Sequence, residues 1–214
     1  MVKRILASVL ALWALAGPLV AQDPESMYAG IFRGKLPAAY PYKYNGTYYW
    51  DTKEFRVGDV LYNGRLYKDI LMNVDAYLDE LEVRPLDRVS AMVVFRDQVA
   101  WFKMGENTFV NLRYLGYAEA PEGFFEVIRD GETPILLKVS KWLRFDANGG
   151  FNQIGYDDPE FNSSIPNFFQ RVETYYALEK GQLKKINKRN LKRRLASPAG
   201  EPSLGLESVT WHSH

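Results

Sequence analysis

The chain has 214 residues, 47% of them hydrophobic and 14% aromatic, with a formal net charge of +1; this excludes a disordered chain and a protein held to nucleic acid by its overall charge. It contains no cysteine, which excludes disulfides, thiolate metal sites, iron–sulfur clusters and thiol catalysis. A chain of this size can bury a core without covalent cross-links, and we expect one domain.

The first 21 residues have the layout of a secretory signal peptide. Two cations, Lys3 and Arg4, precede an apolar run over 5–16, a Gly-Pro break follows, and polar residues start at Gln22. The run is shorter than the roughly 20 apolar residues that span a bilayer. We therefore expect a cleaved leader, a periplasmic or secreted protein, and no transmembrane segment after cleavage. Losing two cations and no acid would change the net charge from +1 to −1.

The next part of the chain predicts a change from irregular structure to strands. Residues 22–44 carry three prolines and are expected to be irregular. Alternating aromatics around Asn45-Gly46 predict strand and turn over 40–50. Farther on, Asn63-Gly64 predicts a hairpin, because a type I′ turn needs positive φ at both central residues. The strands predicted from the β-forming stretches cover 57–62, 65–67, 70–74, 77–83, 91–95, 98–103, 108–112, 124–128, 135–139, 172–178 and 183–186.

The C-terminal part predicts a long loop, a last hairpin and a helix. Residues 144–168 are rich in Gly, Pro, Asn and Ser and are expected to be a loop. Asn187 is expected to cap a helix over 188–195. The predicted organisation is a signal peptide at 1–21, an irregular segment at 22–44, a single β-rich domain at 45–195 and a disordered tail at 196–214. The predicted fold class is mainly β, an antiparallel hairpin meander forming a sandwich or open barrel with a short C-terminal helix.

Histidine is confined to His212 and His214, at the end of the chain. Without a histidine inside the domain, neither a Ser-His-Asp triad nor a His-ligated catalytic zinc site can form there. We therefore predict no catalytic residue, no metal site and no cofactor. The acidic stretch over 157–160 lacks the spacing of a calcium loop, and whether it binds calcium is left open.

Two groups of side chains are candidates for binding. The aromatic group could form a platform for sugar rings, and with acids of the long loop it could serve a carbohydrate-binding module or a glycosidase-like enzyme. The aromatic residues are Tyr42, Tyr44, Tyr49 and Trp50, and the acids are Asp157, Asp158 and Glu160. The alternative for these aromatics is packing within or at the rim of a sheet.

The second group is a basic stretch that contains no acid. It comprises Lys184, Lys185, Lys188, Arg189, Lys192, Arg193 and Arg194. Such a patch is either a solvated helix face or a site for an anionic lipid surface. Because the leader would take the chain out of the cytosol, we expect no nucleic-acid partner.

Several hairpin segments resemble a family of exported, uncharacterised β-rich envelope proteins of Gram-negative bacteria. The resembling residues are 58–67, 75–81, 123–127 and 174–181, followed by the lysine-rich helix. The resemblance implies an envelope location and brings no activity or catalytic residue. We expect a non-enzymatic secreted or periplasmic protein that binds or packs against a cell-envelope component, which can be a protein, a glycan or an anionic lipid surface. Scaffolding within an envelope assembly is a further alternative.

Overall fold

The computed structural model describes residues 30–86, 89–146, 161–201, 204 and 206. The chain divides into two compact units, residues 1–30 and 31–214, and the fold described here is that of the second. The predicted signal peptide, the acidic stretch over 157–160 and both histidines lie outside the described residues.

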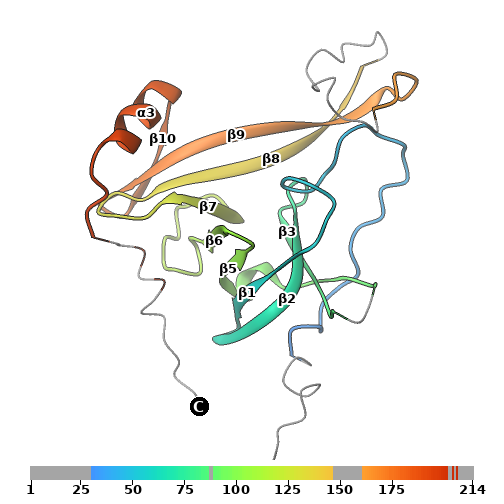
Figure 1. Ribbon diagram of the computed structural model, residues 1–214, viewed down its shortest axis with the longest axis horizontal. Helices are drawn as coiled ribbons and strands as arrows, with labels where there is room; N and C mark the ends of the chain where they lie inside the picture. The colour runs from blue at the N-terminus through green and yellow to red at the C-terminus, as the bar shows by residue number, and fades with distance from the viewer. Residues whose placement is uncertain (1–29, 87–88, 147–160, 202–203, 205, 207–214) are drawn as a thin grey trace, which may run out of the picture. The chain divides into compact units, whose positions relative to one another are not determined.

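Within the described residues, the second unit is built on one ten-stranded antiparallel sheet (Figure 1). Its strands are β1 (Arg56–Tyr62), β2 (Arg65–Asp75), β3 (Glu80–Arg84), β4 (Met92–Val93), β5 (Val99–Met104), β6 (Asn107–Asn111), β7 (Phe124–Arg129), β8 (Ile135–Phe145), β9 (Asn167–Glu179) and β10 (Gln182–Ile186). They lie in the order β10-β9-β8-β7-β6-β5-β1-β2-β3-β4, so the sheet has two edges and is not closed into a barrel. The predicted mainly β, antiparallel meander is confirmed.

Local turn chemistry explains the hairpins. Asn63 and Gly64 have φ of 50° and 71° between β1 and β2, as a type I′ turn requires. Lys180 and Gly181 have φ of 49° and 77° between β9 and β10. Both turns were predicted from the sequence, because a polar residue followed by glycine tolerates this backbone conformation best.

Four segments differ from their predicted structure. Residues 77–79 are a turn, and β3 begins only at Glu80. The predicted strand over 91–95 is reduced to β4, and a 3₁₀ helix, Arg96–Gln98, follows directly. Residues 40–50 contain no strand, and their backbone pairs with the sheet through isolated bridges at Asn45 and Tyr49. The predicted loop over 144–168 is shorter at both ends, because β8 and β9 extend into it and pair over eleven residues.

The two faces of the sheet pack different residues. Because side chains alternate along a strand, Lys138 and Lys141 of β8 lie on opposite faces. On the Lys141 face, the rings of Phe102 and Phe109 stack with centroids 4.7 Å apart, and the ring of Trp50 meets Phe109 edge-on at 5.3 Å. The Lys138 face carries a cluster of buried residues: Val110, Leu112, Ala120, Phe125, Leu136, Leu178 and Leu204.

The helix α3 (Lys188–Ala196) follows β10 at one edge of the sheet (Figure 1). The predicted cap is confirmed, since the side-chain oxygen of Asn187 accepts from the backbone N–H of Asn190 at 2.9 Å. Of the predicted disordered tail, the described part contacts the sheet: Leu204 is 7% exposed within the apolar cluster. No described helix is long and apolar enough to cross a membrane.

Candidate functional site

The basic end of the protein consists of β10 and α3. Its helix is fixed to the sheet by two contacts from its last turn. Arg129 of β7 donates to the backbone oxygens of Arg194 and Ser197, at 2.5 Å and 2.8 Å; the Arg194 oxygen also accepts from the backbone N–H of Ser197. Arg194 in turn pairs with Glu179 of β9. The position of α3 is therefore set by its C-terminal turn.

Most cations of the basic end remain available to a partner. Of the seven predicted residues, Lys184 and Arg194 both pair with Glu179, while Lys188 lies near enough to Glu173 to lower the pKa of that carboxyl. The other four are Lys185, Arg189, Lys192 and Arg193. All four are exposed, and none has an acidic partner among the described residues.

An apolar edge accompanies these charges. Leu191 and Leu195 are one turn apart on α3 and therefore lie on the same side of the helix. Leu195 is 42% exposed, and Leu191 is partly buried. A short helix with cations around an incompletely covered apolar edge has the chemistry of a helix that lies in the surface of a membrane.

An open pocket of about 380 Å³ lies where β9, β10 and the start of α3 meet. Its lining combines cations with hydroxyl and amide groups: Arg171, Glu173, Thr174, Tyr175, Lys185, Ile186, Asn187 and Lys188. Three of these residues are cations and one is an acid, so the pocket carries the same sign of charge as the rest of the basic end.

The predicted aromatic residues do not form one exposed platform. Tyr49 and Trp50 are buried, each 8% exposed, and only Tyr42 stands out, at 64% exposed. Tyr44 is partly buried, and its ring contacts Phe169 at a centroid distance of 4.8 Å. Tyr42 lines an open pocket of about 460 Å³ together with Lys43, Asn162, Ser164, Asn167 and neighbouring prolines and isoleucine.

Two buried carboxylates lie beneath the tyrosines. Asp75 and Glu82, 1% and 2% exposed, accept hydrogen bonds from the hydroxyls of Tyr40 and Tyr49. Burial raises the pKa of Glu82 to about 7, with the Tyr49 hydroxyl opposing the shift. Burial also raises the pKa of both tyrosines, so their hydroxyls remain protonated donors. These pairs anchor the segment before β1 to the β2–β3 pair, and no pattern in the sequence predicts them.

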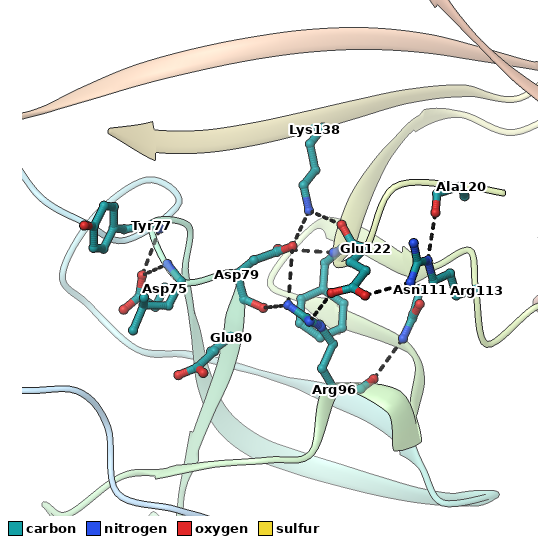
Figure 2. A network of polar contacts seen from close by, with 12 residues as sticks. Asp75, Tyr77, Asp79, Glu80, Arg96, Asn111, Arg113, Ala120, Glu122 and Lys138 are labelled. Carbon is teal, nitrogen blue, oxygen red and sulfur yellow. Dashed lines mark hydrogen bonds and ion pairs between the residues drawn. The ribbon is translucent and has the colours of Figure 1, made fainter. Parts of the chain in front are cut away.

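A network of charged groups crosses the Lys138 face (Figure 2). Lys138 donates to the carboxylate of Asp79 and to the backbone oxygen of Glu122, the latter at 3.0 Å. Glu122 accepts from Arg96 and Arg113, each at 2.7 Å, and Arg96 also reaches Asp79. Each charged group of this network lies beside an opposite charge, so the network joins four parts of the chain.

The backbone around this network is tightly constrained. Asp79 has φ of 60°, an uncommon conformation for a residue other than glycine, and its Oδ1 accepts from the N–H of Phe124 at 3.3 Å. Gly123 has φ of 95°, and a Cβ there would lie 1.3 Å from Asp79 Oδ2. A side chain at residue 123 would therefore occupy the place of the Asp79 carboxylate.

Among the described residues, no group of three or more His, Cys, Asp or Glu side chains is placed to hold a metal ion. Compared with protein-family models, with curated proteins and with solved structures, the chain matches none of them. Only its own geometry and chemistry therefore bear on function.

Proposed function

We propose that the protein binds the anionic lipid surface of a membrane in the cell envelope, and that it does so through the basic end. The supporting observation is the group of four exposed cations, Lys185, Arg189, Lys192 and Arg193, that have no acid beside them in the described structure. Each cation near an anionic membrane contributes about 1 kcal/mol of attraction.

The arrangement favours a lipid surface over a soluble partner for two reasons. The cations come from both a strand and a helix, so they present charge over an area instead of converging on one small anion. Leu195, which is 42% exposed among these cations, can enter the apolar part of the interface. The predicted leader supports an envelope location, where such surfaces are found.

Vesicle co-sedimentation tests the proposal. The full chain is mixed with phosphatidylcholine vesicles that contain or lack phosphatidylglycerol, at low and at high salt. We expect binding only to the anionic vesicles, weakened by salt because the charges are exposed. The variant Lys192→Gln/Arg193→Gln should lower the partition coefficient by about tenfold or more.

The control variant is Lys68→Gln/Lys103→Gln. It removes the same charge from exposed residues of β2 and β5 and should bind like the wild type. Equal loss in both variants would show an effect of net charge alone. Absence of binding to anionic vesicles by the wild type would reject the proposal.

A second candidate function, glycan binding, rests on Tyr42. Its exposed ring beside the amide and hydroxyl groups of Asn162, Ser164 and Asn167 combines a stacking face with hydrogen-bonding groups. A glycan array with the wild type and Tyr42→Ala tests it. A glycan signal that Tyr42→Ala removes would support this function, and an array without signal would exclude it.

A further inference from the structure

The outer edge of β9, on the side away from β8, is open over residues 170–174. Strand β10 lies beside only one end of β9, and its pairing stops where Ile186 meets Tyr175 (Figure 1). At the other end, Asn45 makes an isolated bridge to Phe168. Between these two contacts, no described segment pairs with the outer side of β9. An unpaired strand edge is a template on which another strand can pair.

The backbone groups of this edge point outward at alternate residues. The N–H of Phe169 donates to the oxygen of Asn45 at 3.1 Å, and the N–H of Asn45 donates to the oxygen of Asn167 at 2.9 Å, both on the side away from β8. Because hydrogen-bonding groups alternate along a strand, the N–H and C=O of Arg171 and Glu173 point to that same side. Both residues are exposed, and within the described structure no backbone group pairs with them there.

The open pocket of about 380 Å³ adjoins this edge at the end where β10 begins to pair. Arg171, Glu173, Lys185 and Lys188 are the charged residues of its lining. Its single acid, Glu173, already accepts from Arg171 Nε at 2.9 Å and from the Tyr175 hydroxyl at 3.1 Å. Lys185 and Lys188 are exposed and form no ion pair within the described residues. The pocket therefore keeps a positive charge beside the open edge.

We infer that β9 binds the extended C-terminal end of another protein as an added strand, and that the terminal carboxylate enters the positive pocket. The backbone groups of Arg171 and Glu173 supply the main-chain hydrogen bonds of such a complex. A chain that runs parallel to β9 ends at the pocket, where its carboxylate is attracted by Lys185 and Lys188. An amino terminus at the same place would be repelled.

The length of the open edge favours a chain end over a continuous strand. A longer added strand meets the backbone of Asn45 at one end and Ile186 at the other. The β9 strand of a second copy has 13 residues and is too long to lie between them. The site therefore suits a short terminal segment of a partner, and it goes beyond the lipid contact proposed for the basic end.

Selection from a peptide library tests this inference. Random C-terminal segments with free carboxylates are displayed on phage and selected on the immobilised full chain, and we expect particular sequences to be enriched. Each enriched segment is then synthesised with a free carboxylate and as its C-terminal amide, and fluorescence polarisation gives both dissociation constants. The amide should bind about tenfold more weakly, because it lacks the charge that attracts the pocket cations. No enrichment, or equal affinity of the two forms, would overturn the inference.

Methylation of the peptide amides, one at a time, tests whether the bound segment is an added strand. A strand directs every second N–H toward its neighbour, so methylation at alternate residues should weaken binding by about tenfold or more. Methylation at the residues between them should have a much smaller effect. Losses that do not alternate would show that the peptide does not pair with β9.

Two pairs of variants separate the edge from the pocket and from the lipid contact, since Lys185 belongs to both proposed surfaces. Glu173→Pro and Glu173→Gln both remove the carboxylate, but only proline removes the outward N–H, so only Glu173→Pro should lose about tenfold in affinity. Lys185→Gln/Lys188→Gln should abolish the preference for the free carboxylate, whereas Lys192→Gln/Arg193→Gln should keep it. Equal effects within a pair would overturn that part of the site. Circular dichroism shows which variants are folded, and the methylated peptides test the edge with the wild type alone.

Discussion

Lys138 and Lys141 lie three residues apart in the same strand, and the sheet gives them opposite surroundings. On one face, Lys138 meets Asp79 and the backbone oxygen of Glu122 (Figure 2). On the other face, the Lys141 side chain forms no ion pair among the described residues, and Arg171 is its cross-strand neighbour. Burial lowers the pKa of both lysines; Asp79 opposes the shift at Lys138 through its charge and a hydrogen bond, whereas Asp51 opposes it at Lys141 through its charge alone.

The comparison shows how one strand can carry two lysines in different electrostatic surroundings. A buried ion pair with its hydrogen bonds satisfied holds segments together, and removing one partner leaves a charge without compensation. A buried amine that forms no ion pair does not stabilise the fold, because its charged form loses hydration that nothing replaces. What separates the two lysines is therefore their partner, because the depth of burial is similar.

The largest effect is expected from Gly123→Ala, which disturbs the contact between Asp79 and Lys138. The new Cβ would lie 1.3 Å from Asp79 Oδ2 and 2.3 Å from Lys138 Nζ, at a φ of 95° that alanine rarely adopts. We expect a loss of about 3 kcal/mol or more in the free energy of unfolding, measured by chemical denaturation.

The matched control for this variant is Gly64→Ala. Gly64 also has positive φ, 71°, but a Cβ there meets nothing within 4 Å. Only the backbone strain should remain, about 1 kcal/mol. Equal losses in the two variants would mean that the contact with Asp79 contributes nothing.

The two lysines can be compared directly by replacing each with methionine. Lys138→Met leaves the carboxylate of Asp79, 20% exposed, without its closest cation, and we expect a loss of about 2 kcal/mol or more. Lys141→Met removes a buried charge that forms no ion pair and approximately keeps the length of the side chain. The free energy of unfolding should be unchanged or rise by about 1 kcal/mol. Similar losses in both variants would show that Lys141 has an acceptor after all.

The pH dependence of Lys141 sharpens the comparison. Its pKa falls from 10.5 to about 8 on folding, so between these values the folded state binds fewer protons than the unfolded state. The contribution of Lys141 to the free energy of unfolding therefore rises with pH across that window. Below about pH 8 the folded state bears the full cost of burying the protonated amine. Relative to Lys141→Met, the wild type should gain up to about 3 kcal/mol between pH 8 and 10.5, measured by denaturation at both values. If the difference in free energy of unfolding between the wild type and Lys141→Met does not change with pH, the lowered pKa of Lys141 is contradicted.

How far the sequence predicts these features depends on how local they are. The turns at Asn63-Gly64 and Lys180-Gly181 and the cap at Asn187 depend on neighbouring residues, and all three were predicted. Tyr49 and Trp50 looked like a platform because they are aromatic and close together. Their burial depends on contacts with Glu82 and Phe109, which are distant in sequence.

The two lysines could not be separated from the sequence. The partner of Lys138 lies 59 residues earlier, in a turn where a strand was predicted. The neighbour of Lys141 depends on the register of β8 with β9, and a predicted loop covered the ends of both strands. The basic end was found because its cations all lie within 184–194, whereas its attachment by Arg129 spans more than 60 residues.

Glu82 is a third buried charged group, and its hydrogen-bond partner is the neutral hydroxyl of Tyr49, whereas the partner of Lys138 is a carboxylate. Burial raises its pKa from 4.5 to about 7, so between these values the folded state binds more protons than the unfolded state. Stability from this carboxyl is complete below about pH 4.5 and is lost as pH rises to 7, the opposite sign to Lys141. Glu82→Gln should abolish a loss of up to about 3 kcal/mol across that window.

The Tyr49 hydroxyl stabilises the ionised form of Glu82 by a 2.9 Å hydrogen bond. Tyr49→Phe should therefore raise the pKa of Glu82 further and move the loss of stability to higher pH, as thermal unfolding at a series of pH values would show. An unchanged window in Tyr49→Phe would mean that the hydroxyl does not reach the carboxylate in solution. In that case the Tyr49 hydroxyl would not stabilise the Glu82 carboxylate. Of Glu82, Lys141 and Lys138, only Lys138 would then have a partner that stabilises its charged form.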